Sequence, residues 1–256
     1  MKSVVISLQS AAARREHIEK EFGKQKVDFD FFDALTPDLA KPLAAKMQLN
    51  FQDDFLTPGE LACFMSHVSL WQKMVDENIS HMAIFEDDVF LGKDADLVLN
   101  HSTWIKPDWD IIKIEAFASK ILRSKEAIEI PSTERKVFQL KGKNLGTAGY
   151  ILSLNGAKKY LGYIKHIQLI PLDELMFKKF VENSIHPVFQ MEPAIAIQEM
   201  MLYPETRTVL SSDLLAERKV RMRKQKKKGL KKIEHELLRI LIKFKYALYG
   251  SKNSFK

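Results

Sequence analysis

The sequence predicts a single α/β domain followed by a basic, amphipathic helical tail. Short apolar runs, such as residues 4–8 and 82–85, alternate with segments of helical periodicity, which is the pattern of α/β proteins. The second run ends in three consecutive carboxylates. Charge is also divided along the chain: residues 218–256 hold 15 Lys and Arg against two Glu, and the remainder holds 25 against 31 acidic residues.

A chain of 256 residues without internal repeats or a Ser/Gly-rich linker indicates a domain over residues 1–215 and a tail over 216–256. The single cysteine, Cys63, excludes an intramolecular disulfide and fits a reducing compartment. The first apolar run is too short for a signal peptide. No stretch approaches the ~20 apolar residues needed to span a bilayer. We therefore expect a cytoplasmic protein.

The N-terminal part predicts a first strand at 4–8, a helix over 11–22 capped by Ser10, a half-buried strand at 27–31, and a loop with a short helix over 33–56. Arg14 and Arg15 lie in the first turns of that helix, close to the end of the first strand. A helix start beside a strand end suits an anion, although solvated helix charges are the simpler interpretation.

The clearest helix begins at Thr57, which with Glu60 forms the pattern of a capping box. Apolar residues at helical spacing then form one stripe: Leu61, Phe64, Met65, Val68, Trp71 and Val75. Cys63 and His67 lie on a neighbouring face. We interpret His67 as a hydrogen-bonded structural residue and not as a metal ligand.

The C-terminal half predicts strands at 82–85, 110–115, 137–140, 146–153 and 185–189, and a helix over 155–163. Glycines flank the strand at 146–153, which indicates close approach of a neighbouring strand or a ligand. Asp173 opens a second acidic element at 171–177. It caps the following helix or faces a cleft.

The carboxylates of Glu86, Asp87 and Asp88 cannot lie inside a sheet ladder, so we place them at the end of the strand. Ligands bind outside the carboxyl ends of strands in open α/β sheets. A hard divalent cation there would relieve the repulsion and could hold a diphosphate. A solvated acidic turn is the alternative.

Six blocks, in order, resemble glycosyltransferase family 25, in particular the bacterial lipooligosaccharide β-1,4-galactosyltransferases. They are residues 5–8 with Arg14 and Arg15, 31–35, 62–67, 85–89, 146–151 and 171–177. The resemblance runs from residue 4 to about residue 199. It implies a GT-A-like α/β/α sandwich that transfers a hexose, galactose from UDP-galactose, with inversion onto a lipooligosaccharide acceptor. UDP-glucose is the alternative donor.

The resemblance also implies a Mn²⁺ or Mg²⁺ cofactor and a set of site residues. The acidic triplet lacks Asp at its first position. We therefore expect Asp88 as direct metal ligand and Asp87 as ligand or ribose contact. The other expected donor contacts are Ser7, Leu8, Arg14, Arg15, Glu86, Gly146 and Thr147. Asp173 is the expected general base and Glu174 the second candidate.

The tail predicts attachment to an anionic membrane surface through residues 218–248. Ten Lys and Arg fall within residues 218–232. The apolar stripe after them comprises Leu230, Ile233, Leu237, Leu241, Phe244 and Leu248. Lys243 and Lys245 interrupt it, so the helix should lie in the interface of the inner membrane's cytoplasmic face. The alternative is a helix docked on the protein's own core.

Two other functional classes remain open on the residues alone. A nucleic-acid-binding protein would use the basic tail, but an acidic body would be repelled by phosphates. A metal-dependent phosphohydrolase would use the acidic triplet, but such sites gather further His and Asp ligands. We expect an enzyme that does not bind nucleic acid.

Overall fold

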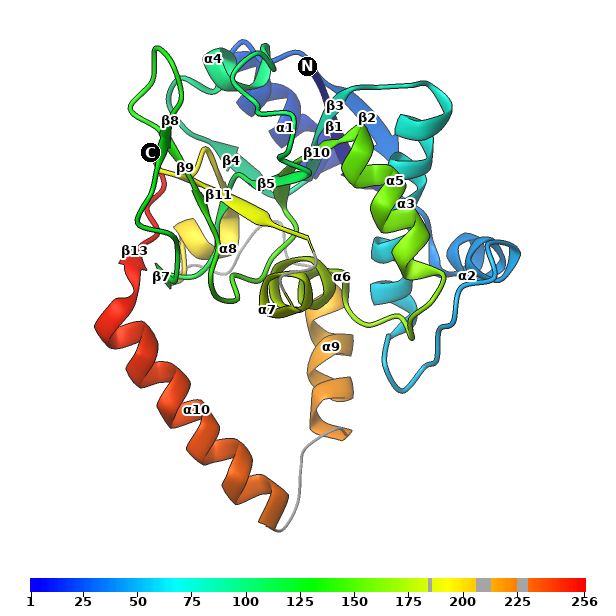
Figure 1. The fold of residues 1–256 in the computed structure, drawn as a ribbon. Helices are drawn as coiled ribbons and strands as arrows, with labels where there is room; N and C mark the ends of the chain where they lie inside the picture. The colour runs from blue at the N-terminus through cyan, green and yellow to red at the C-terminus, as the bar shows by residue number, and fades with distance from the viewer. Residues whose placement is uncertain (184–185, 206–212, 225–229) are drawn as a thin grey trace.

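The computed structural model describes residues 1–183, 186–205, 213–224 and 230–256. Its centre is an eight-stranded mixed sheet with helices on both faces (Figure 1). In order across the sheet the strands are β2 (Asp30–Asp33), β1 (Lys2–Ser7), β3 (His81–Glu86), β10 (Gly149–Ser153), β5 (Ile111–Lys113), β11 (Val188–Glu192), β9 (Lys136–Gln139) and β8 (Ile128–Glu129). The predicted α/β class is confirmed.

The strand directions bring several chain segments to one edge of the sheet. β1 is parallel to β2 and β3, and β5 is parallel to β11. β10 lies between β3 and β5 and is antiparallel to both. The carboxyl ends of β1, β3 and β5 therefore meet the beginning of β10 at the same edge.

Alternating side chains of the strands form two hydrophobic cores, one on each face of the sheet. In β1, Val4 and Ile6 belong to one core and Val5 to the other, as expected when successive side chains point to opposite faces. The first core packs against α2 (Pro37–Lys46), α3 (Pro58–Asp76) and α5 (Leu154–Ile164). The second packs against α1 (Ala12–Lys24) and α4 (Ala95–Leu99).

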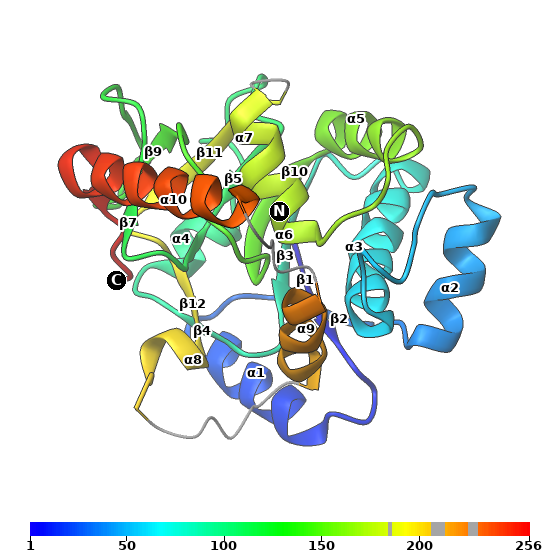
Figure 2. The same cartoon turned by 90° about the horizontal axis from the view of Figure 1, so that it is seen from below.

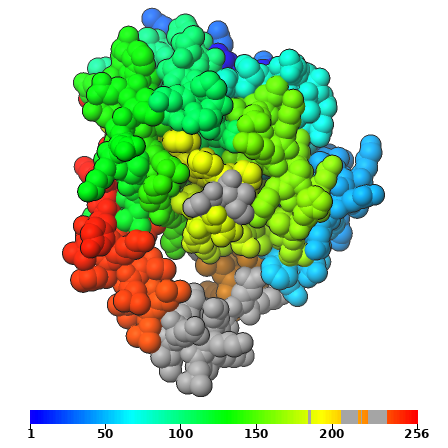
Figure 3. Space-filling model, in the orientation of Figure 1, coloured from blue at the N-terminus to red at the C-terminus, as the bar shows by residue number. Residues whose placement is uncertain are grey.

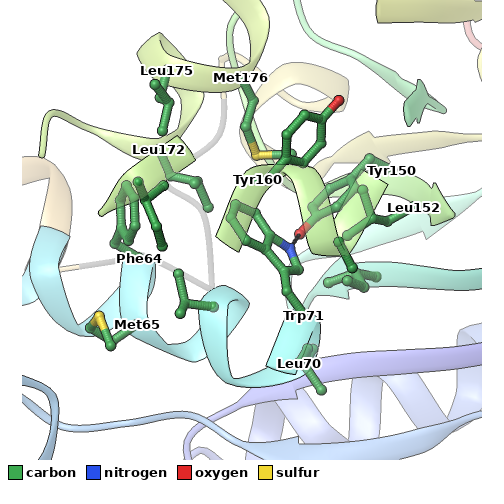
Figure 4. Packing of buried hydrophobic residues seen from close by; sticks show 14 of the residues in the cluster. Phe64, Met65, Leu70, Trp71, Tyr150, Leu152, Tyr160, Leu172, Leu175 and Met176 are labelled. Carbon is green, nitrogen blue, oxygen red and sulfur yellow. Dashed lines mark hydrogen bonds between the residues drawn. The ribbon is translucent and has the colours of Figure 1, made fainter. Parts of the chain in front are cut away.

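The capping box predicted for α3 is confirmed. The Thr57 hydroxyl accepts the Glu60 N–H at 3.1 Å, and the Glu60 carboxylate accepts the Thr57 N–H at 2.9 Å. Further along α3, the Trp71 indole donates to the Tyr150 hydroxyl on β10 at 2.9 Å (Figure 4). This buried bond ties the middle of α3 to the sheet.

Helix α1 differs from the expectation at both ends. Ala11 is the N-cap residue, so the prediction that Ser10 caps this helix is wrong. The helix continues through Gly23 to Lys24. The predicted loop over 33–56 contains α2, which accommodates Pro42 within its length.

Short elements surround the central sheet. A three-stranded sheet has the order β4 (Val89–Leu91), β12 (Ala196–Gln198), β6 (Glu115–Ala116), and β7 (Lys120–Ile121) pairs with β13 (Ser251–Lys252). The acidic element at 171–177 opens a continuous helical segment made of α6 (Leu172–Glu174), the π-helix η1 (Leu175–Lys179) and α7 (Phe180–Asn183). Helix α8 (Glu199–Leu202) directly follows β12.

The C-terminal segment contains α9 (Asp213–Lys224) and α10 (Leu230–Tyr249), and the boundary predicted after residue 215 falls inside α9. Helix α9 lies beside α3 and reaches α6 (Figure 2). In contrast, α10 protrudes from the body (Figure 3). Of the predicted basic run, Lys226, Lys227 and Lys228 lie outside the described residues.

The chain returns to the body after α10. Ser251 and Lys252 pair with β7, and the buried Asn253 side chain donates to the Ala118 carbonyl at 3.0 Å. Helix α10 is thus held between two anchored segments, α9 and residues 251–256. Within the described part of the chain, no helix combines the length and the hydropathy needed to cross a bilayer.

Candidate active site

Four strands deliver polar side chains to one edge of the central sheet. β1 ends at Ser7, β3 at Glu86 and β5 at Lys113. Gly146 and Thr147 precede the antiparallel β10 and therefore lie at the same edge. This edge is the position at which open α/β sheets bind ligands.

Asp87 is held by two of the residues expected to contact the donor. The Ser7 hydroxyl donates to one carboxylate oxygen at 2.7 Å, and the Arg14 guanidinium donates to the other. Arg14 lies near the start of α1, directly after β1. Its charge therefore neutralises Asp87, which makes this carboxylate better suited to positioning than to metal binding.

Arg15 stabilises the turn between β1 and α1 through hydrogen bonds to the carbonyls of that turn. It donates to the carbonyls of Ser7 and Leu8 at 3.0 and 3.2 Å, pairs with Asp33 and lies 4.7 Å from the Phe31 ring centre. These contacts give Arg15 a structural role. The Leu8 side chain is exposed at the sheet edge.

Glu86 and Thr147 form a pair across β3 and the beginning of β10. The Thr147 hydroxyl donates to Glu86 at 2.6 Å. Burial, together with the charge of Asp88, raises the pKa of Glu86 to about 8, so this group holds a proton at neutral pH when no cation is bound.

Asp88 is the carboxylate that best fits a divalent cation. Burial raises its pKa, and the nearby Asp87 adds to the effect, while Gln198 and Arg14 oppose it. The Gln198 side-chain nitrogen lies 3.2 Å from both Asp88 oxygens. A cation would offset the cost of burying the charged carboxylate. Mg²⁺ and similar ions are commonly held by one or two carboxylates together with substrate phosphates, which this arrangement allows.

A buried ion pair that the sequence reasoning missed completes this edge. Lys113 donates to Glu115 at 2.6 Å and to the Gly146 carbonyl at 2.5 Å. Burial lowers the pKa of Lys113 and raises that of Glu115, while each charge opposes this for the other. The sequence did contain an indication of this pair, because residues spaced i and i+2 lie on the same face of an extended segment.

Gly146 is required where the chain passes over this pair. Its φ is +93°, and a Cβ there would lie 2.7 Å from a Glu115 carboxylate oxygen. A side chain would therefore collide with the buried carboxylate, besides adopting an unfavourable backbone conformation. This explains the glycine that precedes β10 and agrees with the expected close approach.

Asp173 and Glu174 have different surroundings. Asp173 is buried, and its carboxylate accepts the Glu174 backbone N–H at 2.9 Å and the Arg218 guanidinium at 3.0 Å. Glu174 is partly exposed and pairs with Lys178 at 3.5 Å. Pro171 is the N-cap of α6, so the alternative in which Asp173 is the capping residue is wrong.

Arg218 belongs to α9, whereas from the sequence we expected it only as part of the membrane-binding run. A second arginine of this helix, Arg221, is buried and donates to both oxygens of Glu60 at 2.8 and 2.9 Å. The same Glu60 carboxylate caps α3. Helix α9 therefore covers acidic groups next to the site, which a count of charges along the chain could not show.

His67 has the structural hydrogen bond that was expected. Its Nδ1 lies 2.9 Å from the Tyr150 hydroxyl, the same hydroxyl that accepts from Trp71. Burial lowers the pKa of His67 to about 3, so the ring is neutral. The imidazole is thus a fixed, uncharged group between α3 and β10.

Comparison with known proteins identifies the family. The model of glycosyltransferase family 25 (LPS biosynthesis protein) matches residues 1–176. The lipooligosaccharide biosynthesis protein lic2B of Haemophilus influenzae is 38% identical, covering 90% of this chain and 87% of that protein. The lipooligosaccharide biosynthesis protein lex-1 of H. influenzae is 34% identical, covering 96% of this chain and 93% of that protein.

A relative from another genus agrees. The lacto-N-neotetraose biosynthesis glycosyltransferase LgtE of Neisseria meningitidis serogroup B is 34% identical, covering 95% of this chain and 90% of that protein. The alignments extend over nearly the whole chain, including the strand ends that form the polar edge. The resemblance inferred from six short blocks is confirmed, and the chain belongs to glycosyltransferase family 25.

Proposed function

We propose that the protein transfers galactose from UDP-galactose, with inversion and in β-1,4 linkage, onto an acceptor sugar of lipooligosaccharide. The observation that supports this most is the convergence of Ser7, Arg14 and the acidic triplet at the carboxyl edge of the sheet in a family 25 chain. Several relatives carry lipooligosaccharide biosynthesis in their names. Family membership does not favour the nucleic-acid alternative. UDP-glucose remains the second candidate donor.

The donor would lie along the edge from β1 to β10. In this proposal Arg14, Asp87 and Ser7 form a rigid unit that positions the nucleotide, and the exposed Leu8 side chain offers an apolar contact for the base. Arg15 acts indirectly because its donors hold the β1–α1 turn. In the same proposal, the sugar of the donor lies next to the backbone at Gly146 and the Thr147–Glu86 pair.

Asp88 is the proposed ligand of a Mn²⁺ or Mg²⁺ ion. A bound divalent cation supplies electrostatic stabilisation of the diphosphate leaving group. Arg14 already neutralises Asp87, so Asp87 contributes to the site by fixing the end of β3. The buried Lys113 adds a positive charge at the same edge, partly compensated by Glu115.

Asp173 is the proposed general base. It is buried next to the polar edge, and two hydrogen bonds fix its orientation. Removal of the acceptor proton by a positioned carboxylate contributes typically ~10²–10⁴-fold. Glu174 is the weaker candidate because it pairs with Lys178 near solvent. Arg218 must release the second oxygen of Asp173, or share it, when the acceptor binds.

Attachment to an anionic membrane, at the cytoplasmic face of the bacterial inner membrane, is the proposed role of α10. Its apolar face, defined here as Leu237, Leu241, Phe244 and Leu248, retains 58–66% of its surface. Tyr246, about 180° from Leu237 around the helix, donates to the Lys143 carbonyl at 3.0 Å. One side of α10 thus contacts the body while the apolar face points away from it, which supports a membrane partner over docking on the core.

A donor panel tests the activity. UDP-galactose, UDP-glucose and related UDP-sugars are offered with lactosyl and GlcNAc-terminated acceptors, with Mn²⁺, with Mg²⁺ and with excess EDTA. We expect transfer from UDP-galactose that requires a divalent cation. Asp88→Asn should remain folded and lose nearly all transfer. Full turnover in EDTA would refute the cation role, and preference for UDP-glucose would refute the galactose assignment.

A further inference from the structure

Helix α3 and the end of β3 bring together three side chains that bind metals. One ligand atom from each of Cys63, His67 and Glu86 lies within 4.8 Å of the other two. Cys63 and His67 are one helical turn apart on α3, so they share a face. Throughout the described ranges, this is the only group of three His, Cys, Asp or Glu side chains that close together.

The histidine has a free atom for such a site. His67 is fully buried, and its Nε2 has no hydrogen-bond partner. Its Nδ1 is already bonded to the Tyr150 hydroxyl, and the ring stacks on Tyr150 at an interplanar angle of 25°. Buried polar atoms without a partner are rare and require a physical reason. A metal-bound histidine commonly uses its second nitrogen for such an orienting hydrogen bond.

The charge around the site favours a cation. The acidic side chains of Glu86, Asp173 and Glu60 lie close enough to the Cys63 sulfur to interact with it electrostatically, and Arg218 is the positive charge that opposes them. A thiolate and a carboxylate together carry two negative charges, which one divalent ion balances. Burial of the complete site would then involve no net charge.

We propose that Cys63, His67 and Glu86 bind a Zn²⁺ ion, separately from the donor-associated cation at Asp88. His67 would then be a metal ligand as well as the hydrogen-bonded structural residue expected from the sequence. Thiolate and imidazole ligands select borderline-soft ions such as Zn²⁺, whereas Mg²⁺ and Mn²⁺ favour oxygen ligands. Ligand atoms around tetrahedral zinc lie roughly 3.5 Å apart, given metal–ligand distances of about 2.0–2.3 Å. The observed separations of up to 4.8 Å are longer than this, so side-chain rotation must bring the three ligand atoms closer together when the ion binds.

Three protein ligands leave a fourth position open to water or to a substrate oxygen. The ion would also connect α3 directly to the end of β3, next to Thr147 and the polar edge of the sheet. The site therefore has two consequences: it braces the edge, and it presents an electrophilic ion beside it. This inference stands on the three ligands alone and does not depend on the donor or acceptor proposed above.

Cobalt provides the test because Co²⁺ reports its ligands spectroscopically. Purified, reduced, metal-free full-length protein is titrated with Co²⁺ in place of Zn²⁺. We expect a thiolate-to-cobalt charge-transfer band, intense d–d bands typical of four-coordination, one ion per chain, and displacement by Zn²⁺. Cys63 is the single cysteine, so any thiolate band reports on this site.

Variants distinguish this site from others. Cys63→Ala should abolish the charge-transfer band. His67→Gln and Glu86→Gln should each weaken Co²⁺ binding by more than the roughly 10–100-fold typical of losing an outer-shell partner. Asp88→Asn is the matched control and should retain the band. Circular dichroism checks folding, and Glu86→Gln, at a strand end, provides a test if the buried His67→Gln does not fold.

Absence of the band in folded wild-type protein overturns the site, and so does Co²⁺ affinity unchanged in both His67→Gln and Glu86→Gln. A protein that transfers hexose but shows no band would refute this inference and leave the proposed function intact. A protein that shows the band but transfers no sugar from any UDP-sugar would refute the proposed function and leave the zinc site intact.

Discussion

Helices α9 and α10 come from one basic stretch of chain, yet their side chains meet opposite environments. In α9, Arg218 and Arg221 reach Asp173 and Glu60. In α10, the apolar face is exposed and no described side chain covers it. The difference shows that a run of Lys and Arg residues does not by itself indicate what the segment binds. Its role depends on whether carboxylates lie within reach in the folded chain.

The contrast also changes how the C-terminal segment should be tested. Deleting it would remove the α9 ion pairs and the anchored residues 251–256 along with the membrane candidate. Loss of folding or activity would then say nothing about lipid binding. Single substitutions in each helix separate these roles.

The largest effect is expected where α9 meets the site. Asp173→Asn should lower kcat by about 10²–10⁴-fold, because a neutral amide cannot accept the acceptor proton. Binding of UDP, measured by calorimetry, should change little. Glu174→Gln is the matched control and should leave kcat nearly unchanged. Equal kcat values for wild type and Asp173→Asn would exclude Asp173 as the base.

Next comes the buried pair between α9 and α3. Arg221→Met leaves the Glu60 carboxylate buried without its main partner, and breaking a buried ion pair in this way typically costs about 3–5 kcal/mol. Hydrogen exchange of the α9 amides should be faster than in wild type by the factor that corresponds to this loss of free energy. In the control Lys20→Met, which breaks an exposed pair with Glu16, the free energy of unfolding should stay close to that of wild type. Similarly small losses of stability in Arg221→Met and Lys20→Met would contradict a stabilising role for Arg221.

Arg218 should contribute less to the docking of α9 than Arg221. Its side chain is 30% exposed, so water screens its pair with Asp173. Arg218→Gln should therefore weaken the docking of α9 by about 1 kcal/mol, which is below the ~1.5–3 kcal/mol typical of hydrogen bonds to charged groups because water screens this pair. The same exchange experiment measures it. A loss larger than that of Arg221→Met would reverse the assigned order of the two arginines.

The smallest effect on stability is expected on the apolar face of α10. Leu241→Ser should change the free energy of unfolding by less than about 0.5 kcal/mol, because the side chain is exposed. Sedimentation with anionic vesicles at low salt should nevertheless decrease. Leu39→Ser, at another exposed leucine on α2, is the matched control and should sediment like wild type. Destabilisation by Leu241→Ser, or unchanged sedimentation, would argue against a membrane-binding face.

Much of the site could be predicted because its residues lie at strand ends that local pattern identifies. An apolar run followed by Glu86, Asp87 and Asp88 forces the carboxylates out of the ladder, whatever the rest of the chain does. The Thr57–Glu60 capping box is equally local and was also found. The N-cap of α1 was not, because Ser10 has the side chain of a good N-cap residue but Ala11 occupies the N-cap position.

The sequence alone determined the α/β class, the polar edge of the sheet, the family and the amphipathic character of α10, since periodicity and short motifs express each of them. Only the tertiary structure decided which charges meet. Lys113 with Glu115, Arg221 with Glu60 and Arg218 with Asp173 are set by strand order and helix docking. The proximity of Cys63, His67 and Glu86 arises in the same way, because contacts between distant segments depend on packing that no local pattern encodes.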